Sequence, residues 1–232
     1  GQTKYELVNF DRYSELFYTR GQNWKMPGVK EAIIVGPDHG TDSYWRQTNS
    51  YQPTDMANGD GVVLHPSANY VQYYGMANGL PLDDPESGWT NTQPWKDRDP
   101  RFYHDIIYDG VKMINSTWAV EKWKWADLGK SDTYIGSYRE DPDRTSRTGY
   151  LMYKLIPRYS NKWDREHEGW AAAVNMGLTE LRLADVYLMY AEAAAQGYSG
   201  AGNAKSPKFS KSAVEAINVI RNRAGVGNVA NK

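Results

Sequence analysis

The chain has 232 residues, which is enough for one sizeable domain or two small ones. Its 27 Lys and Arg balance 28 Asp and Glu, which argues against a nucleic-acid-binding protein and against a polybasic membrane-surface segment. The absence of cysteine excludes disulfides, thiolate catalysis and Cys-based zinc sites, and no apolar stretch approaches the roughly 20 residues of a membrane-spanning helix.

The N-terminal part of the sequence predicts one helix and one strand, followed by long loops. Thr3 and Glu6 have the spacing of a capping box, and apolar residues at helical spacing follow, so we expect an amphipathic helix over Lys4–Tyr18. The apolar run Ala32–Val35 is typical of a short strand. The rest of Gln22–Gly61 is rich in Gly, Asn, Asp and Pro, and long ordered loops of this kind are often functional.

The middle of the sequence predicts short elements joined by turns. Ser67 can cap a short helix that runs to Tyr74, and a helical turn is expected at Asp99–Tyr103. The segment Ile106–Ile114 has apolar residues on both sides of an Asp-Gly pair, which predicts a β-hairpin with a type I′ turn. A further strand is expected within Tyr150–Ile156.

The last third of the sequence predicts two long helices. Apolar positions cover two adjoining faces of Leu181–Ala195, which indicates a helix buried between neighbours, and Gly197 is its expected C-terminal stop. Ser212 and Glu215 form a capping box ahead of a second helix that continues to Ala224. Together they would form an αα-hairpin of the tetratricopeptide kind, and one such pair cannot bury its faces alone.

Five stretches between residues 70 and 226 carry a family resemblance. They are YVQYYGMANGLP at 70–81, DRDPRFYHDIIYDG at 97–110, GYLMYKLI at 149–156, RLADVYLMYAEA at 182–193 and AVEAINVIRNRAGV at 213–226. In this order they resemble the pattern of the SusD/RagB family, and KEAIIV at 30–35 resembles a strand of the same family. The two C-terminal stretches are the most specific part of the match.

The resemblance implies a mainly α fold, in which tetratricopeptide-type helix pairs pack with an irregular, loop-rich subdomain containing short β-hairpins. On this basis we expect residues 1–232 to be part of a single SusD-like domain. Residues 1–176 would form the loop-rich subdomain, and residues 177–232 would form the αα-hairpin.

The resemblance also implies a function. SusD-like proteins are lipoproteins on the outward-facing surface of the outer membrane, held by an N-terminal lipid anchor that this chain does not contain. They bind glycans, or peptides in the RagB branch, and pass them to a SusC-like TonB-dependent transporter. They are not enzymes and need no cofactor. Some members hold calcium, but this sequence has no Asp-x-Asp-x-Asp-Gly loop and no calcium ligand can be assigned.

The aromatic composition is consistent with a sugar-binding surface. There are 9 Trp and 18 Tyr but only 4 Phe, and Trp and Tyr combine an apolar ring with a polar edge. The C–H face of a pyranose stacks on such rings. The alternative is that a loop-rich domain uses these side chains to fix its own loops in place.

The candidate ligand-binding residues are Trp45, Tyr44, Trp24 and Trp89. The first three lie in the loop segment Gln22–Gln52, where rings are mixed with amide, carboxylate and guanidinium groups that can bind sugar hydroxyls. Each stacked ring could contribute about 1 kcal/mol. The alternative is that Trp45 packs under its own loop.

Trp89 and Trp95 flank a short loop before the Asp-Pro-Arg motif and could extend the sugar-binding surface. At least one of them is expected to be structural. Asp97 and Asp99 suggest paired catalytic carboxylates, but the resemblance implies a structural motif in which Arg101 forms charge-assisted hydrogen bonds.

Three alternative functions remain open from the sequence. The first is a RagB-like peptide receptor, and the second is an adaptor whose role is docking on the transporter. The third is a glycoside hydrolase, for which Asp38 with Asp42, or Glu166 with Glu168, would be the carboxylate pair.

Overall fold

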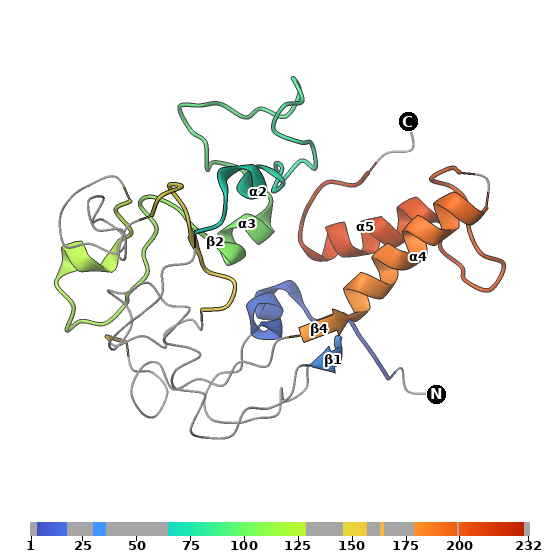
Figure 1. Cartoon of the computed structure of the whole chain (residues 1–232), viewed down its shortest axis with the longest axis horizontal. Helices are drawn as coiled ribbons and strands as arrows, with labels where there is room; N and C mark the ends of the chain where they lie inside the picture. Colours follow the sequence, from blue (N-terminus) through green and yellow to red (C-terminus); the bar gives the residue numbers. More distant parts are fainter. Residues whose placement is uncertain are drawn as a thin grey trace.

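Helix is the main regular structure of this protein, and short strands join segments that are distant in the sequence (Figure 1). The computed structural model describes residues 4–17, 30–35, 65–128, 146–156, 163–164, 179–198 and 200–229. In chain order the elements are the 3-10 helix η1 (Phe10–Leu16), β1 (Ala32–Val35), α2 (Ala68–Gln72), α3 (Pro100–Asp105), β2 (Ile106–Ile107), the 3-10 helix η2 (Glu121–Lys124), β3 (Leu151–Met152), β4 (Thr179–Arg182), α4 (Leu183–Gly197) and α5 (Ala213–Arg223).

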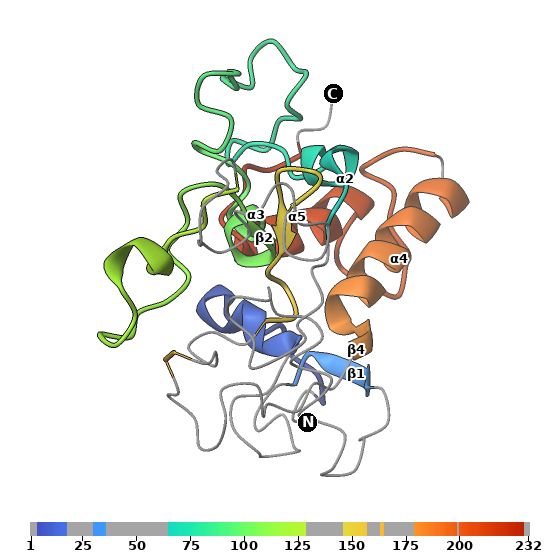
Figure 2. The ribbon, with the colours of Figure 1, turned by 60° about the vertical axis from the view of Figure 1, so that its left-hand side comes forward.

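The two long helices form the predicted αα-hairpin and lie side by side (Figure 2). Their interface is made of alanines, Ala191 and Ala194 on α4 with Ala213 and Ala216 on α5, and these small side chains allow the two backbones to approach closely. The Ser212 capping box is present: the Ser212 hydroxyl accepts from the amide of the third helical residue, whose carboxylate accepts from the Ser212 amide.

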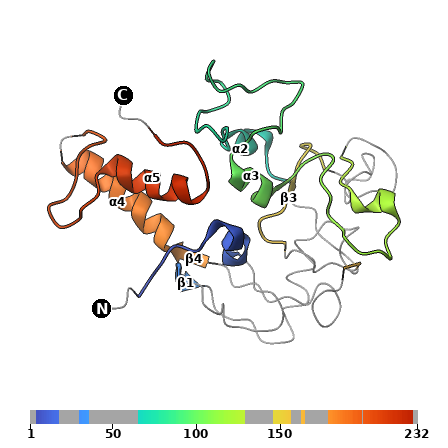
Figure 3. The ribbon, with the colours of Figure 1, turned by 180° about the vertical axis from the view of Figure 1, so that it is seen from behind.

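Helix α4 begins at Leu183, two residues later than expected, because the preceding residues form β4. This strand pairs antiparallel with β1, which has the predicted bounds. In Figures 1 and 3 the β1–β4 ladder lies at the start of α4, and η1 lies between this ladder and the helices α2 and α3. The ladder therefore connects the N-terminal part of the chain to the αα-hairpin.

A buried charge cluster lies at one end of this ladder, around Glu31, which directly precedes β1. Glu31 has no exposed surface, and its Oε2 accepts hydrogen bonds from Arg223 at 2.6 Å and from the amide of Val8 at 2.8 Å. Its Oε1 lies 3.9 Å from the guanidinium of Arg182. Because removal of a carboxylate from water is costly unless it is paired, these contacts fix one arrangement of the N-terminal segment, β4 and α5.

The helix predicted over Lys4–Tyr18 is wrong in its N-terminal half. Residues 4–9 are not helical, and only Phe10–Leu16 form a helix, of the 3-10 type. The backbone amide of Glu6 donates to the carbonyl of Lys30, and that of Val8 donates to Glu31. These amides cannot also serve a helix, so tertiary hydrogen bonds override the local apolar pattern.

The predicted hairpin over Ile106–Ile114 is also wrong. The Asp-Gly turn is present, with Gly110 at a φ of 83°, but β2 pairs with β3 instead of the segment after the turn. The amide of Met113 donates to Lys124, so the predicted second strand pairs with residues further along the chain. The strand expected within Tyr150–Ile156 is present as the two residues of β3.

Candidate functional site

Three tyrosines, one on α2 and two in the turn that ends it, form one side of a pocket, and we call them the α2 tyrosines. The Ser67 hydroxyl caps the helix by accepting from the Tyr70 amide at 3.2 Å, and the tyrosines at 70, 73 and 74 share a helical face. The pocket has a volume of about 250 Å³ and we call it the tyrosine pocket. It is lined by Tyr13, Tyr70, Tyr73, Tyr74, Asp99, Arg101, Asp105 and Lys154.

Asp105 is the acceptor at the back of the tyrosine pocket. Its Oδ2 accepts from the Tyr74 hydroxyl at 2.8 Å and lies 3.5 Å from the Tyr13 hydroxyl and 3.9 Å from Nζ of Lys154. The hydroxyls of Tyr70 and Tyr74 are 3.3 Å apart. One buried carboxylate therefore orients side chains from three other segments.

Arg101 and Asp99 form a second ion pair of the tyrosine pocket, next to that of Lys154 and Asp105. Nε of Arg101 donates to both oxygens of Asp99, at 3.0 and 3.2 Å, and these hydrogen bonds raise the pKa of Arg101. Asp99 also caps α3 by accepting from the Arg101 amide. The predicted charge-assisted contact is present, and it lies within the first turn of α3.

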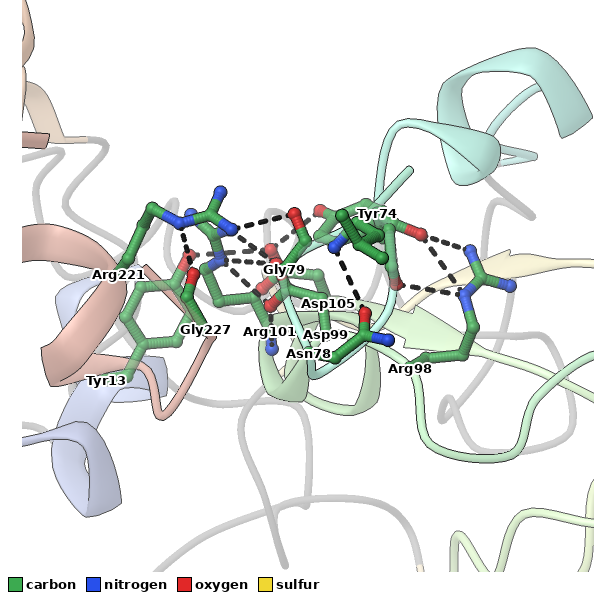
Figure 4. Close-up of polar contacts among 12 residues, drawn as sticks. Tyr13, Tyr74, Asn78, Gly79, Arg98, Asp99, Arg101, Asp105, Arg221 and Gly227 are labelled. Carbon is green, nitrogen blue, oxygen red and sulfur yellow. Dashed lines mark hydrogen bonds and ion pairs between the residues drawn. The ribbon is translucent and has the colours of Figure 1, made fainter. Parts of the chain in front are cut away.

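Arg98 holds α2 in place. It is 3% exposed, and its guanidinium donates to the carbonyls of Val71, Tyr74, Gly75 and Pro94. Figure 4 shows the contact with Tyr74. Val71 lies in the last turn of α2, and Tyr74 and Gly75 follow the helix directly, so the guanidinium binds the C-terminal end of α2. Arg98 therefore fixes the position of the α2 tyrosines relative to α3.

Arg221 connects the same region to α5. Its guanidinium donates to the carbonyls of Gly227 at 2.6 Å and Gly79 at 2.8 Å (Figure 4). The amide of Gly227 donates to Ala77 at 2.8 Å. A loop after α2 is thus held against the segment that follows the last helix.

The pKa values of Tyr74 and Tyr13 are raised, primarily because burial disfavours the phenolate and further because Asp105 is close. Both hydroxyls therefore keep their protons and can act as donors to Asp105 over the physiological range.

These shifts predict a loss of stability in alkali. As the pH rises above the ordinary tyrosine value of 10.0, Tyr74 ionises in the unfolded chain before it ionises in the native protein. The stability that Tyr74 contributes is therefore complete below pH 10 and is lost above it. The free energy of unfolding falls by about 1.4 kcal/mol for each pH unit over which Tyr74 is ionised in the unfolded state only. Urea denaturation at about pH 8 and about pH 11 should show a smaller decrease for Tyr74→Phe than for the wild type. An equal decrease in both proteins would contradict this assignment.

The ligand-binding residues predicted from the sequence either lie away from the tyrosine pocket or fall outside the residues that the structure describes. Trp45, Tyr44 and Trp24 all fall outside the described residues, so nothing tests them. Trp89 is half-buried, and its indole N–H donates to the carbonyl of Pro94 at 3.2 Å within its own loop. It does not line the tyrosine pocket. Trp95 packs against Tyr108, with ring centroids 5.3 Å apart, as expected of a structural residue.

Sequence reasoning missed the α2 tyrosines as site residues. The i, i+3, i+4 spacing of Tyr70, Tyr73 and Tyr74 on a capped helix was a usable signal, because it places three rings on one face. Lys154 and Tyr13 gave no such signal, since they come from other segments.

A second pocket of about 250 Å³ lies on the αα-hairpin and is almost entirely apolar. It is lined by Leu183, Val186, Tyr187, Tyr190 and Phe209. Among the residues that the structure describes, no helix is long and apolar enough to cross a membrane, and no group of three acidic or histidine side chains is placed to hold a metal ion.

Comparisons with known proteins agree with this fold. The model of the SusD family matches residues 30–232. A SusD-like protein from Bacteroides fragilis NCTC 9343 aligns with a TM-score of 0.60 and 24% identity, over 97% of this chain and 41% of its own. A SusD-like carbohydrate-binding protein from the same organism aligns with a TM-score of 0.54 and 22% identity, over 95% of this chain and 38% of its own.

The chain thus spans less than half the length of these solved relatives. No curated protein matches the sequence. Because the family model covers most of the chain, and the fold agrees with that of SusD-like structures, this chain belongs to the SusD family.

Proposed function

We propose that this chain is part of a glycan-binding protein on the outer surface of the outer membrane that delivers its ligand to a SusC-like TonB-dependent transporter. Membership of the SusD family supports the cellular setting. The tyrosine pocket is the observation that carries the proposal of glycan binding. In this proposal residues 1–176 supply the ligand contacts and residues 177–232 supply the αα-hairpin that supports them.

Tyr73 is the main platform for a sugar ring. Its side chain is 87% exposed, and within the described part of the chain it makes no hydrogen bond. Tyr70, 47% exposed, lies on the same face. A pyranose stacked on Tyr73 would place its hydroxyls near the charged edges of Asp105, Arg101 and Lys154, which line the same pocket. An apolar ring next to a few fixed polar groups is the usual arrangement of a small-ligand site.

The pocket is better suited to binding than to hydrolysis. A glycosidase needs one carboxylic acid that protonates the leaving group and a second carboxylate that acts as base or nucleophile. Asp99 is engaged by Arg101 and by the start of α3, and Asp105 by Tyr74 and Lys154. The other pairs considered, at 38 and 42 and at 166 and 168, lie outside the described residues.

Replacing Tyr73 with alanine tests the proposal. The wild-type protein is first tested on a carbohydrate-and-peptide array to find the polysaccharide that it binds. We expect Tyr73→Ala to lose about tenfold in affinity for that polysaccharide, because a stacked ring contributes about 1 kcal/mol in addition to the free energy gained by burying its apolar surface. The fold should not change, since Tyr73 is exposed. Tyr198→Ala is the matched control, because Tyr198 is 48% exposed at the end of α4, away from the pocket lining, and this variant should bind like the wild type.

Two other results would redirect the assignment. Glycan binding that Tyr73→Ala leaves unchanged would move the site to Trp45, Tyr44, Trp24 or Trp89, which remain candidate stacking positions. Binding of peptides without any glycan would replace glycan capture by a RagB-like peptide receptor.

A further inference from the structure

The charges of the tyrosine pocket cancel in pairs. Two of its lining residues are carboxylates, Asp99 and Asp105, and two are cations, Arg101 and Lys154. Each cation lies next to one of the carboxylates. The pocket therefore offers a ligand no net charge, although it is rich in polar groups.

The pair of Arg101 with Asp99 leaves the guanidinium little freedom to bind an anionic ligand. Nε contacts both carboxylate oxygens, and the terminal Nη2 contacts the same carboxylate. Asp99 is 3% exposed, so a ligand anion that displaced it would leave a buried carboxylate without its cation. Such a separation is strongly unfavourable.

The pair of Lys154 with Asp105 has the same consequence. Nζ of Lys154 lies 3.9 Å from Oδ2 of Asp105 and 4.4 Å from the ring centroid of Phe17, so the ammonium is held by a carboxylate and an aromatic face. The Asp105 side chain is 4% exposed and is fixed by Tyr74. An anionic ligand would meet this carboxylate as soon as it approached the ammonium.

We infer that the tyrosine pocket selects uncharged glycans and discriminates against uronic-acid and sulfated ones, an inference that rests on the proposed function. A hydroxyl of an uncharged sugar can accept from the exposed parts of Arg101 or Lys154 without separating either ion pair. A carboxylate or sulfate has to compete with Asp99 or Asp105 for a cation that each already neutralises. Asp105 is thus a specificity-determining residue: it neutralises Lys154 and repels anionic sugars.

The first test compares wild-type binding to neutral gluco-, manno- and xylo-oligosaccharides with binding to polygalacturonate and a sulfated glycosaminoglycan. We expect binding only to a neutral glycan, with an affinity that changes less than about twofold between about 0.05 and about 0.5 M NaCl, since no ligand charge is screened. Equal or tighter binding to an acidic glycan, weakened by salt, would overturn the inference and leave glycan capture intact. If no glycan of any class bound, the proposed function itself would fail.

The second test is Asp105→Asn, which keeps the shape of the side chain and an acceptor for Tyr74 but releases Lys154 from its partner. This variant should gain at least tenfold in affinity for polygalacturonate, with a clear salt dependence. Asp83→Asn is the matched control, because Asp83 is an exposed carboxylate outside the pocket lining, and it should gain nothing. A folded Asp105→Asn protein with no gain would contradict the role of Asp105. If the variant did not fold, the salt dependence of the wild type would still decide the inference.

Discussion

Replacing Glu31 with alanine is expected to destabilise the protein by about 3–5 kcal/mol, because the substitution leaves Arg223 buried without its carboxylate and removes one of the two carboxylates beside Arg182, the other being Asp185. The two arginine side chains are only 9% and 18% exposed, and the amide of Val8 would lose its acceptor as well. Chemical denaturation followed by circular dichroism measures the difference. Glu31→Gln retains an acceptor for Val8 and should cost less than alanine.

Glu6→Ala is the control for this experiment. Like Glu31, Glu6 pairs with a cationic side chain: its carboxylate lies 3.7 Å from Nζ of Lys30. The side chains of Glu6 and Lys30 are, however, 67% and 57% exposed. Exposed pairs of this kind contribute about 0–1 kcal/mol. A cost for Glu31→Ala as small as that of Glu6→Ala would show that the buried cluster is not what holds the N-terminal segment.

Gly227→Ala should be the second strongly destabilising change, by about 2–3 kcal/mol. A Cβ at this position would overlap the carbonyl oxygen and carbon of Asn78, which are backbone atoms and cannot move independently. The loop would have to shift, and the hydrogen bonds from Gly227 to Ala77 and from Arg221 to Gly227 would weaken.

Gly197→Ala isolates this steric effect. Gly197 is the last residue of α4, and a Cβ there would meet nothing within 4 Å. Alanine is a better helix former than glycine, so this variant should be neutral or slightly more stable. Thermal melting of both variants makes the comparison, and equal midpoints would mean that the contact between the two loops is not tight in solution.

The parts of the fold that depend on local signals were predictable from the sequence. The capping box at Ser212, the strand Ala32–Val35 and the N-cap at Ser67 all use residues within a few positions of one another. Asp185, in the first turn of α4, accepts from the amide of Arg182 at 2.8 Å, which is again a contact between residues only three positions apart.

The wrong predictions share one physical cause. At residues 4–9 and after the turn at Gly110, the pattern of side chains was correct for a helix and for a hairpin, but the backbone amides bond to distant partners. A sequence window cannot show these partners. The same reason hid the tyrosine pocket, because Tyr13, Asp105 and Lys154 meet only when three separate segments have folded together.

The contact between Glu31 and Arg223 joins residues that are 192 positions apart, and the one between Thr179 and Leu16 spans 163. Closing such long loops costs chain entropy before any contact is gained, and topologies rich in distant pairs fold slowly. During synthesis the N-terminal strand therefore has to wait, unpaired, until β4 and α5 have left the ribosome. We expect this interval to be when the protein depends most on chaperones, because an exposed strand edge readily pairs with other chains.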